Sequence, residues 1–517
     1  MSRTFSIDNL IKVKENILKP ICFASNIEAY LVGGCTRDIL LGNGEVNDVD
    51  IVCNDAEQMV NALVQYCSTN DVKYSINKMS NGHATVVTVN YKQLMKDSFS
   101  IEPETIDFEI SQFTDKKLSF GTAFRTILNN DAESRDFTCN AWYYPIHNNE
   151  KPFTPILHKN AIYPVIGNDI IPCNGSQTFI NNPLRIFRAM DLISRGYRPT
   201  PELTLSISDA LKSIYYSDEL RKSMLAIVHK IFVGLAEGKR MVNDVIYAFN
   251  YMMGLGVWGK LIDIKIQWMS TCIHKNSYHY DSVWQHTMWV IKNLYNIGGS
   301  CELKSVQEHI IKPNVYDYWA AFLHDIGKVD TITFDDISCH THFIDHQKYS
   351  VEIATGILRD SPVNSSMTNY ILDLIKVHMD TKPFGDKPIP KSQFKHIRRL
   401  MWELGQIEFE HFLLLNHADC AASERSENKN TLNILAAMRY MKRHNEPCWY
   451  LYRIPINGNV IKDKIPEIPD KYIGKFIDQL YKVTFAHPEN YETEEQCIHY
   501  LKSLINSGWT KESIKNK

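Results

Sequence analysis

Alternating apolar and polar positions predict a β-rich N-terminal part of the chain. Short runs rich in β-branched residues occur at residues 29–34, 49–53 and 84–89, and turn residues separate them. Between the second and third runs, residues 56–67 repeat their apolar positions at helical spacing. We therefore expect a compact α+β unit over about residues 27–144.

From about residue 181 onward the apolar positions follow helical periodicity. Residues 184–197 and 220–238 show this spacing, and a series of aromatic-rich helical segments follows them. Two polar or proline-rich stretches, at residues 381–391 and 423–431, interrupt the pattern. We expect this part of the chain to be almost entirely helical, with a candidate domain boundary at residues 423–431.

Composition and charge narrow the class of protein. Apolar residues make up 44% of the 517 residues and charged residues 22%, which excludes a disordered or fibrous chain. The formal net charge is −3, so a nucleic-acid partner would have to be bound by local basic surfaces. The 12 cysteines include no CxxC pair, which favours a reducing compartment. Because no segment has the apolar length of a signal peptide or membrane helix, we expect a cytoplasmic protein without a membrane partner.

Glycines and carboxylates lie close together in the N-terminal unit. Gly33 and Gly34 directly follow an apolar strand, and Asp48 and Asp50 lie two positions apart at the start of the next. Alternate residues of a strand share one face, so the two carboxylates could bind a pair of divalent cations about 4 Å apart. Such a pair activates an attacking hydroxyl and stabilises a leaving pyrophosphate. The glycines would let the backbone approach a triphosphate, and Arg37 would add positive charge.

A third carboxylate is available in a later strand. In residues 105–113 apolar residues alternate with polar ones, so that one face is apolar and the other is acidic. Either Asp107 or Glu109 could complete a three-carboxylate cage. A lone Gly-Gly is usually only a turn, and a lone Asp-x-Asp is usually a solvated strand edge. It is the order and spacing of these pieces that indicate a site.

Several segments, taken in order, resemble one family: the class II CCA-adding enzymes, tRNA nucleotidyltransferases that also include bacterial poly(A) polymerases. GGCTRDILLG followed by DVDIV resembles the glycine and Asp-x-Asp signature of that family. FEIS resembles its third-carboxylate strand and favours Glu109 over Asp107. DAESRDFTCNA at residues 131–141 resembles its ribose-contacting motif, and NNPLRIFRA at residues 181–189 resembles its base-reading motif.

The resemblance implies roles for individual residues. Asp48, Asp50 and Glu109 become the catalytic, metal-binding set, and a site made only of carboxylates suits Mg²⁺. Arg185 becomes the arginine that reads the base. The full set of implied nucleotide contacts is Gly33, Gly34, Arg37, Asp38, Arg135, Asp136, Asn140, Asn182, Arg185 and Arg188.

Two positions depart from the family pattern. Ser134 stands where a first arginine usually precedes Arg135, and Asn182 stands where an acidic residue is usual. A carboxylate only accepts hydrogen bonds, whereas an amide can both donate and accept. We therefore expect Asn182 to discriminate less sharply among bases, and to flip to suit UTP or GTP.

A second set of candidate ligands lies in the helical part of the chain. It consists, in order, of His286, His324, Asp325, His346, His378 and Asp419. When helices converge, such residues can ligate one divalent ion or bridge two. The ordered series resembles the HD phosphohydrolase superfamily. Its imidazole-rich composition suits Ni²⁺, Co²⁺ or Mn²⁺, with Mg²⁺ as an alternative. We interpret His342 as a histidine that only satisfies local hydrogen bonds, and we leave His274 and His279 unassigned.

Together the two resemblances imply an α+β fold: a polymerase-β-like nucleotidyltransferase palm followed by all-α regions. The implied domains are the palm at 1–150, a helical neck with the base-reading motif at 151–270, the HD domain at 271–430, and a helical tail with possible tRNA contact at 431–517. The implied activity is template-independent addition of nucleotides, above all CCA from CTP and ATP, to the 3′ end of tRNA. The HD site would hydrolyse 2′,3′-cyclic or terminal phosphates in RNA end repair.

Three alternatives remain open. Poly(A) polymerases and other RNA-tailing enzymes share the same motifs. An HD hydrolase whose palm is inactive, or a tRNA-binding scaffold, would keep the fold without transfer. The three retained carboxylates argue against a scaffold, because a binding module has no need to place like charges together.

Overall fold

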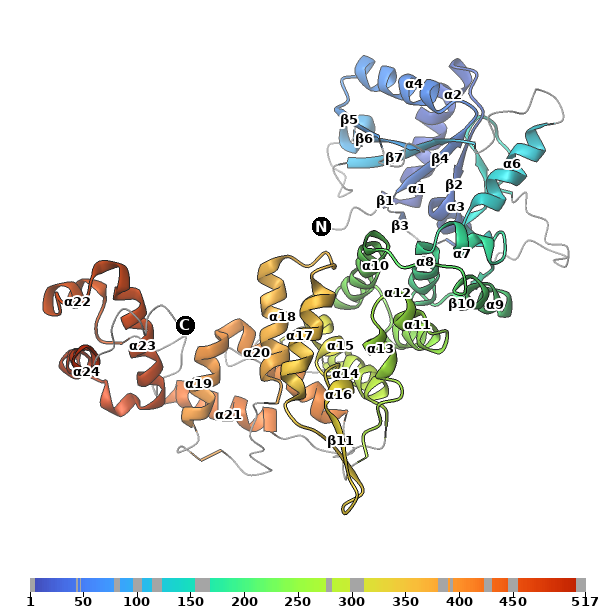
Figure 1. Ribbon diagram of the computed structural model, residues 1–517. Helices are drawn as coiled ribbons and strands as arrows, with labels where there is room; N and C mark the ends of the chain where they lie inside the picture. Colours follow the sequence, from blue (N-terminus) through green and yellow to red (C-terminus); the bar gives the residue numbers. More distant parts are fainter. Residues whose placement is uncertain are drawn as a thin grey trace. The chain divides into compact units, whose positions relative to one another are not determined.

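The computed structural model divides the chain into two compact units, Met1–Leu220 and Arg221–Lys517 (Figure 1). The residues it describes are 5–42, 45–46, 48–78, 84–95, 105–113, 123–153, 168–275, 281–297, 311–379, 389–390, 394–422, 430–444 and 454–507. The candidate boundary at 423–431 lies outside them, apart from its last two residues. Among the described helices, none combines the length and apolarity needed to cross a membrane.

The first unit is built on a six-stranded sheet with the strand order β5-β6-β7-β4-β2-β8. Its strands are β2 Ala29–Val32, β4 Val49–Cys53, β5 Tyr74–Lys78, β6 Ala84–Asn90, β7 Thr105–Gln112 and β8 Tyr144–Pro145. β4 and β7 pair in parallel, and the other neighbours pair antiparallel. The three β-branched runs of the sequence all form strands of this sheet, which confirms the expected α+β architecture.

Helices and short strand pairs surround the sheet. The helices are α1 Ile7–Val13, η1 Lys14–Leu18, α2 Lys19–Ala24, α3 Gly33–Leu41, α4 Ala56–Thr69, α5 Tyr91–Met95, α6 Ala123–Ser134, η2 Thr138–Asn140, α7 Gln177–Asn181, α8 Leu184–Ile193 and α9 Pro201–Ala210. The strand pairs are β1 Phe5–Ser6 with β3 Glu45–Val46, and β9 Asp169–Ile170 with β10 Arg198–Pro199.

The two faces of the sheet have different partners. Ile51 and Phe108 belong to a buried cluster with residues of α1, α2 and α4, and Figure 1 shows α2 and α4 over this face. Val52 packs on the opposite face with Leu128 and other residues of α6. Because successive side chains of a strand alternate between faces, Asp50 lies on the face turned away from α4.

The second unit is almost entirely helical, as the periodicity predicts. Its helices are α10 Asp218–Ala236, α11 Val242–Gly254, α12 Val257–Leu261, α13 Ile264–Trp268, α14 Val283–Ile297, α15 Val315–Leu323, α16 Lys328–Thr331, α17 His346–Leu358, α18 Ser365–Val377, α19 Phe394–Leu404, α20 Gln406–Ala421, α21 Asn430–Arg443, α22 Gly458–Lys464, η4 Asp470–Tyr472, α23 Ile473–Ala486, η5 Pro488–Asn490 and α24 Glu494–Asn506. The sequence did not predict the antiparallel hairpin of β11 Ile332–Asp335 and β12 His340–Phe343.

Aromatic packing fixes the helices that carry the histidines. Phe322 of α15 contacts Phe249, Trp258 and Trp284 with ring centroids 5.5–6.0 Å apart. Such contacts between helices restrain α15, because buried rings interlock at these separations. The end of α15, where His324 and Asp325 follow, is therefore held in place by the core.

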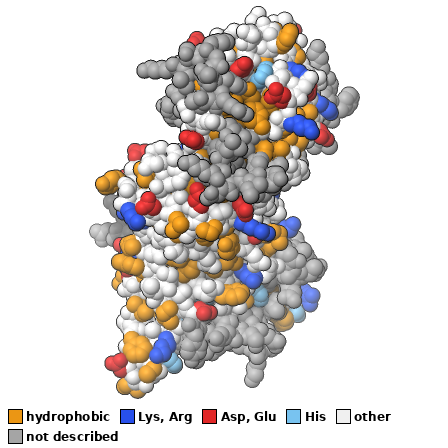
Figure 2. All heavy atoms as spheres, turned by 90° about the vertical axis from the view of Figure 1, so that its right-hand side faces the viewer, with side chains coloured by type: hydrophobic (Ala, Val, Ile, Leu, Met, Phe, Trp, Pro, Cys, Tyr) orange, Lys and Arg blue, Asp and Glu red, His pale blue; other side chains and the backbone are white. Residues whose placement is uncertain are grey.

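Charges of both signs are interspersed on the face of the molecule drawn in Figure 2. Its described atoms show no large area of a single sign, in keeping with the net charge of −3. At the lowest point of that view, where the β11–β12 hairpin ends, hydrophobic side chains gather beside charged ones. In this hairpin Phe334 is 52% and Ile337 is 97% exposed.

Candidate functional sites

The register of two parallel strands brings the palm carboxylates together. Asp50 of β4 lies directly opposite Glu109 of β7. Asp48, which immediately precedes β4, is exposed. Asp107 also lies on this face of β7, but the Thr88 hydroxyl donates a 2.6 Å hydrogen bond to it. The register thus makes Glu109, and not Asp107, the partner of Asp50.

These carboxylates repel one another strongly. Burial, and then the nearby Glu109 carboxylate, raises the pKa of Asp50 to about 7. Burial, and then Asp48, raises the pKa of Glu109. The positive charges of Arg135 and Arg188 oppose both shifts without cancelling them. Clustered carboxylate oxygens with raised pKa values fit a divalent cation with a preference for oxygen ligands, such as Mg²⁺.

Gly33, the first residue of α3, touches the carboxylate of Asp50. Its φ of +71° is in the left-handed region, and a Cβ atom at this position would lie 2.3 Å from Oδ2 of Asp50. No side chain can be accommodated at such a distance without moving the carboxylate. The two motifs that were separate in the sequence, the glycines and the Asp-x-Asp, are therefore parts of one packed unit.

A series of contacts links four of the predicted nucleotide-binding residues. Arg37 Nη1 donates to Asn140 Oδ1 at 2.7 Å, and Asn140 Nδ2 donates to Asp136 Oδ1 at 3.0 Å. Asp136 Oδ2 lies 2.9 Å from Nη2 of Arg188. Arg37 also forms an ion pair with Asp38 at 3.0 Å. Burial alone would raise the pKa of Asp136, but Arg188 and hydrogen bonds from Asn140 and the backbone lower it overall.

Arg135 is anchored by residues that the sequence had not singled out. Its Nε donates to Asp131 Oδ2 and to the Tyr143 hydroxyl, both at 3.1 Å, and its Nη2 lies 2.9 Å from the same Asp131 oxygen. The Tyr143 hydroxyl also donates to Asp131. The i,i+4 spacing of Asp131 and Arg135 was the signal that could have revealed this pair.

The segment that resembles the base-reading motif lines a hollow of about 440 Å³. Its lining includes Glu133, Ser134, Asn182 and Arg185. Arg185 donates from Nη2 to the Ser134 carbonyl at 2.6 Å and from Nη1 to the Thr178 carbonyl at 3.3 Å. The Asn182 Oδ1 accepts a 3.2 Å hydrogen bond from the backbone N–H of Leu184, at the start of α8. The structure therefore brings Asn182, Arg185 and Ser134 to one hollow.

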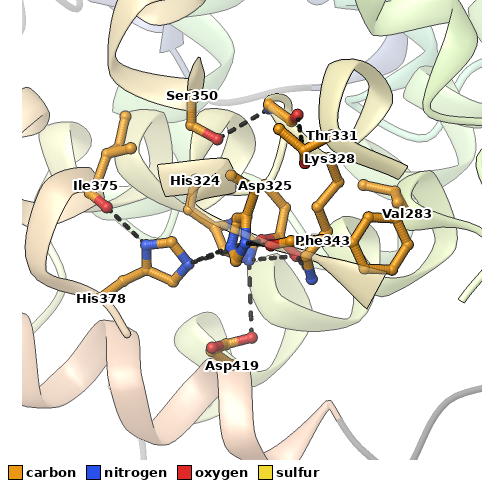
Figure 3. Close-up of polar contacts among 12 residues, drawn as sticks. Val283, His324, Asp325, Lys328, Thr331, Phe343, Ser350, Ile375, His378 and Asp419 are labelled. Atoms are coloured by element: carbon orange, nitrogen blue, oxygen red, sulfur yellow. Dashed lines mark hydrogen bonds and ion pairs between the residues drawn. The ribbon is translucent and has the colours of Figure 1, made fainter. Parts of the chain in front are cut away.

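The six predicted ligands of the helical part lie close together, and Figure 3 labels four of them, His324, Asp325, His378 and Asp419. They come from α14, the ends of α15 and α18, the start of α17, and α20. Their ligand atoms form two groups within 4.8 Å, namely His286, His324 and Asp419, and Asp325, His346 and His378.

Asp325 connects the two groups. Its Oδ2 lies 3.4 Å from Nε2 of His286 and 3.2 Å from Nε2 of His324. Its Oδ1 lies 3.2 Å from Nε2 of His346 and 3.6 Å from Nε2 of His378. One carboxylate thus faces two histidines with each oxygen, which is the arrangement of a ligand that bridges two metal ions.

Backbone carbonyl groups orient three of the histidines. The Nδ1 atoms of His324, His346 and His378 each bond to the carbonyl three residues earlier, at 2.8, 2.8 and 2.6 Å. These bonds leave Nε2 as the ligand atom, as outer-shell bonds do in metal sites. Among the described residues, the buried Nε2 of His324 and Oδ1 of Asp325 have close neighbours but no hydrogen bond of good geometry. Buried ligand atoms without a well-aligned hydrogen-bond partner fit one or two divalent ions.

Lys328 is a neighbour of this centre that the sequence analysis missed. Its Nζ lies 2.6 Å from Asp325 Oδ2 and 3.1 Å from Nε2 of His274, which is buried beside His286. Its place three residues after Asp325 was the available signal. His342 lies on the exposed β12 strand, away from the two ligand groups, and His279 lies outside the described residues.

Comparison with known families agrees with both centres. Residues 29–153 match the poly A polymerase head domain, and residues 283–401 match the HD domain. The first holds the Asp50–Glu109 pair, and the second holds His286 to His378. The resemblance to class II CCA-adding enzymes with an HD domain is thereby confirmed.

Curated relatives match part of this chain. The chain is 27% identical over 217 residues to the mitochondrial CCA tRNA nucleotidyltransferase of Saccharomyces cerevisiae, covering 40% of this chain and 38% of that protein. It is 34% identical over 114 residues to the CCA-adding enzyme of Bacillus pumilus, covering 22% of this chain and 24% of that protein. It is 28% identical over 149 residues to poly(A) polymerase I of Haemophilus influenzae, covering 26% and 31%. The matched part thus spans well under half the length of these relatives.

Solved structures share the fold along nearly the whole chain. A CCA-adding enzyme in complex with CTP has a TM-score of 0.56 at 15% identity, covering 99% of this chain and 100% of that chain. The Thermotoga maritima CCA-adding enzyme in complex with tRNA has a TM-score of 0.53 at 14% identity, covering 98% and 100%. The fold beyond the head domain is therefore that of the CCA-adding enzymes.

Proposed function

We propose that this protein adds nucleotides without a template to the 3′ end of RNA, with CCA addition to tRNA from CTP and ATP as its main reaction. The observation that carries the proposal is the alignment of Asp50 with Glu109, with Gly33 packed against the Asp50 carboxylate. A binding scaffold gains nothing from placing two carboxylates where they repel each other, whereas nucleotidyl transfer needs carboxylates that hold Mg²⁺.

In this reaction the RNA 3′-hydroxyl oxygen forms a bond to the α-phosphorus of the nucleotide. The bond from that phosphorus to the bridging oxygen breaks, pyrophosphate leaves, and the hydroxyl loses its proton. Divalent ions held by Asp48, Asp50 and Glu109 would supply the charge that lowers the cost of these steps. The chain's own part is to position the triphosphate: Arg188, held by Asp136, presents positive charge on the side of the carboxylates.

The decisive experiment uses tRNA lacking its last three nucleotides, Mg²⁺, and each nucleoside triphosphate in turn. The proposal expects stepwise addition of C, C and A and little further growth. A long homopolymer from ATP alone would instead indicate a tailing enzyme, the second candidate, which the match to poly(A) polymerase I of H. influenzae supports. Absence of extension with every substrate would leave only the HD domain active.

For the HD centre we propose metal-dependent hydrolysis of 2′,3′-cyclic or terminal phosphates at RNA ends. Its support is the pair of ligand groups joined by Asp325. A phosphate on the 3′ end leaves no free hydroxyl to attack a nucleotide, so an activity that clears ends serves one that extends them. Lys328, 2.6 Å from Asp325, would place a positive charge beside a bound phosphate.

Hydrolysis of 2′,3′-cyclic AMP, measured on metal-free protein restored with Ni²⁺, Co²⁺, Mn²⁺ or Mg²⁺, tests this proposal. We expect imidazole-rich ligands to favour one of the first three ions. Two ions more per chain in wild type than in His324→Ala with Asp325→Ala, counted by metal analysis, would match the two ligand groups. Equal turnover before and after the ions are restored would contradict it.

A further inference from the structure

We propose that Glu133, not Asn182, is the acceptor that recognises the nucleotide base in this chain. The inference rests on the proposed nucleotide addition and concerns the hollow beside Arg185. Both Glu133 and Asn182 line this hollow, and they differ in what they can offer to a base.

The oxygen of Asn182 is already used by the fold. Its Oδ1 accepts the backbone N–H of Leu184 at 3.2 Å, and only the oxygen of the amide can play that role. The bond opposes a flip of the side chain, so Asn182 offers its Nδ2 donor to a ligand. A carboxylate at this position would retain a second acceptor oxygen after bonding Leu184, whereas the amide has a donor there.

Unlike Asn182, Glu133 has carboxylate oxygens that the described part of the fold does not use and that can only accept hydrogen bonds. It is exposed in the last turn of α6, and it forms no ion pair or hydrogen bond with the residues that the structure describes. In particular, it does not pair with Arg185, although both line the same hollow. The lining also includes Asn130, Asn174 and Asn181, whose amides each carry both a donor and an acceptor. A carboxylate can only accept, so Glu133 is the obligate acceptor of the hollow, as Arg185 is its obligate donor.

The pair of Glu133 and Arg185 matches the edges of cytosine and adenine. Both bases present an amino group that donates and, next to it, a ring nitrogen that accepts. The Glu133 carboxylate would accept from the amino group, and Arg185 would donate to the ring nitrogen. Arg185 has five N–H donors, of which two bond to Ser134 and Thr178, so donors remain. Uracil and guanine present the reverse pattern, an accepting carbonyl and a donating ring N–H, and would oppose both side chains.

The test compares nucleotide binding and nucleotide addition in four variants. Glu133→Gln keeps the size of the side chain and removes the obligate acceptor, and Glu202→Gln, an exposed acid of α9, is the matched control. Asn182→Ala removes the amide. Asn182→Asp is added to Glu133→Gln as a rescue, since it returns an acceptor to the hollow. Dissociation constants for CTP, ATP, UTP and GTP are measured with Ca²⁺, and incorporation is measured with Mg²⁺.

We expect Glu133→Gln to lower the preference for CTP over UTP, and for ATP over GTP, at least tenfold in both measurements. Glu202→Gln should change these ratios less than threefold, Asn182→Ala should lower them much less than Glu133→Gln does, and the rescue should restore most of the preference. Unchanged ratios in Glu133→Gln, or their loss in Asn182→Ala, would overturn the assignment. A wild-type protein that binds CTP and ATP selectively but adds neither to RNA would refute nucleotide addition alone, and leave the role of Glu133 standing.

Discussion

At the scale of single residues, the carboxylate of Asp50 lowers the stability of the protein that carries it. Its raised pKa means that the folded chain holds a proton at pH values where the unfolded chain has lost it. Folding stability from this group is greatest below the unfolded pKa of about 4, and is lost as the pH rises through about 7. A residue retained at such a cost is expected to serve chemistry, not folding.

Replacing Asp50 with Asn should therefore stabilise the metal-free protein at high pH. We expect Asp50→Asn to have a higher melting temperature than wild type at pH 8 in EDTA. The free energy of unfolding should be larger by an amount on the order of 1–2 kcal/mol. The difference should shrink at pH 5, where the wild-type carboxyl is largely protonated, and shrink again when Mg²⁺ is added at pH 8. Calorimetric melting curves at the two pH values measure it. A variant less stable than wild type under all three conditions would count against a strained carboxylate pair.

The same residue should be indispensable for transfer. We expect Asp50→Ala, and likewise Asp48→Ala, to abolish nucleotide incorporation while tRNA binding stays nearly intact, because the metals serve chemistry more than docking. Single-turnover incorporation and filter binding of labelled tRNA give the two readouts. Incorporation within threefold of wild type would exclude these residues from catalysis.

The residue types of both centres were visible in the sequence, but their contacts were not. The order of His286, His324-Asp325, His346, His378 and Asp419 was enough to expect one centre, because few arrangements of helices use such a series otherwise. The position of Glu133 in the hollow beside Arg185 depends on where α6 ends in space, and that of Lys328 beside Asp325 depends on where α16 begins. No periodicity encodes that information.

At the scale of elements, the start of α3 is built around the approach of Gly33 to Asp50. The helix has a second left-handed glycine at its other end, Gly42, with φ +68°, and no atom of the described residues lies within 4 Å of the Cβ position that a side chain would occupy there. The two glycines therefore share the backbone conformation and differ in what surrounds them. Substituting each glycine in turn therefore separates the effect of backbone strain from the effect of crowding the Asp50 carboxylate.

We predict that Gly33→Ala lowers incorporation at least a hundredfold, while Gly42→Ala leaves it within about threefold. Both should lose stability, Gly42→Ala by about 1 kcal/mol from its backbone alone and Gly33→Ala by more. Incorporation kinetics and urea unfolding of the two variants provide the comparison. Equal losses of incorporation would mean that the contact with Asp50 has no special weight.

Periodicity predicted the elements well where one face of each was buried. β4, with buried Val49 and Ile51 flanking Asp50, was recognised as residues 49–53. The β11–β12 hairpin was not, because Ile332 and Phe334 remain exposed and no apolar face marks the strands. A strand without a buried face gives no alternation to detect.

At the scale of the whole molecule, the two centres belong to different compact units. The carboxylates lie within Met1–Leu220, and the histidines lie within Arg221–Lys517. Each centre has its own complete set of candidate ligands, so neither needs the other to bind metal. The two activities should therefore be separable by mutation.

We expect His324→Ala with Asp325→Ala to eliminate hydrolysis of 2′,3′-cyclic phosphates and leave extension of a 3′-hydroxyl RNA largely unchanged. Asp48→Ala with Asp50→Ala should have the converse effect. Each double variant is tested in both assays, and far-ultraviolet circular dichroism checks that it folds. Cyclic phosphate hydrolysed at the wild-type rate by the HD variant with Ni²⁺ or Mn²⁺ would return the six ligands to a structural role.

The parallel register of β4 and β7 also determines which insertions and deletions beside β7 the carboxylate site could tolerate. Shifting β7 by one residue would exchange its apolar face with its acidic face and place Phe108 or Ile110 opposite Asp50. A shift of two residues in one direction would instead place Asp107 there, with the apolar face still buried. The strand thus carries a second acid on the same face, and a shift of two residues in that one direction should be far less damaging than a shift of one.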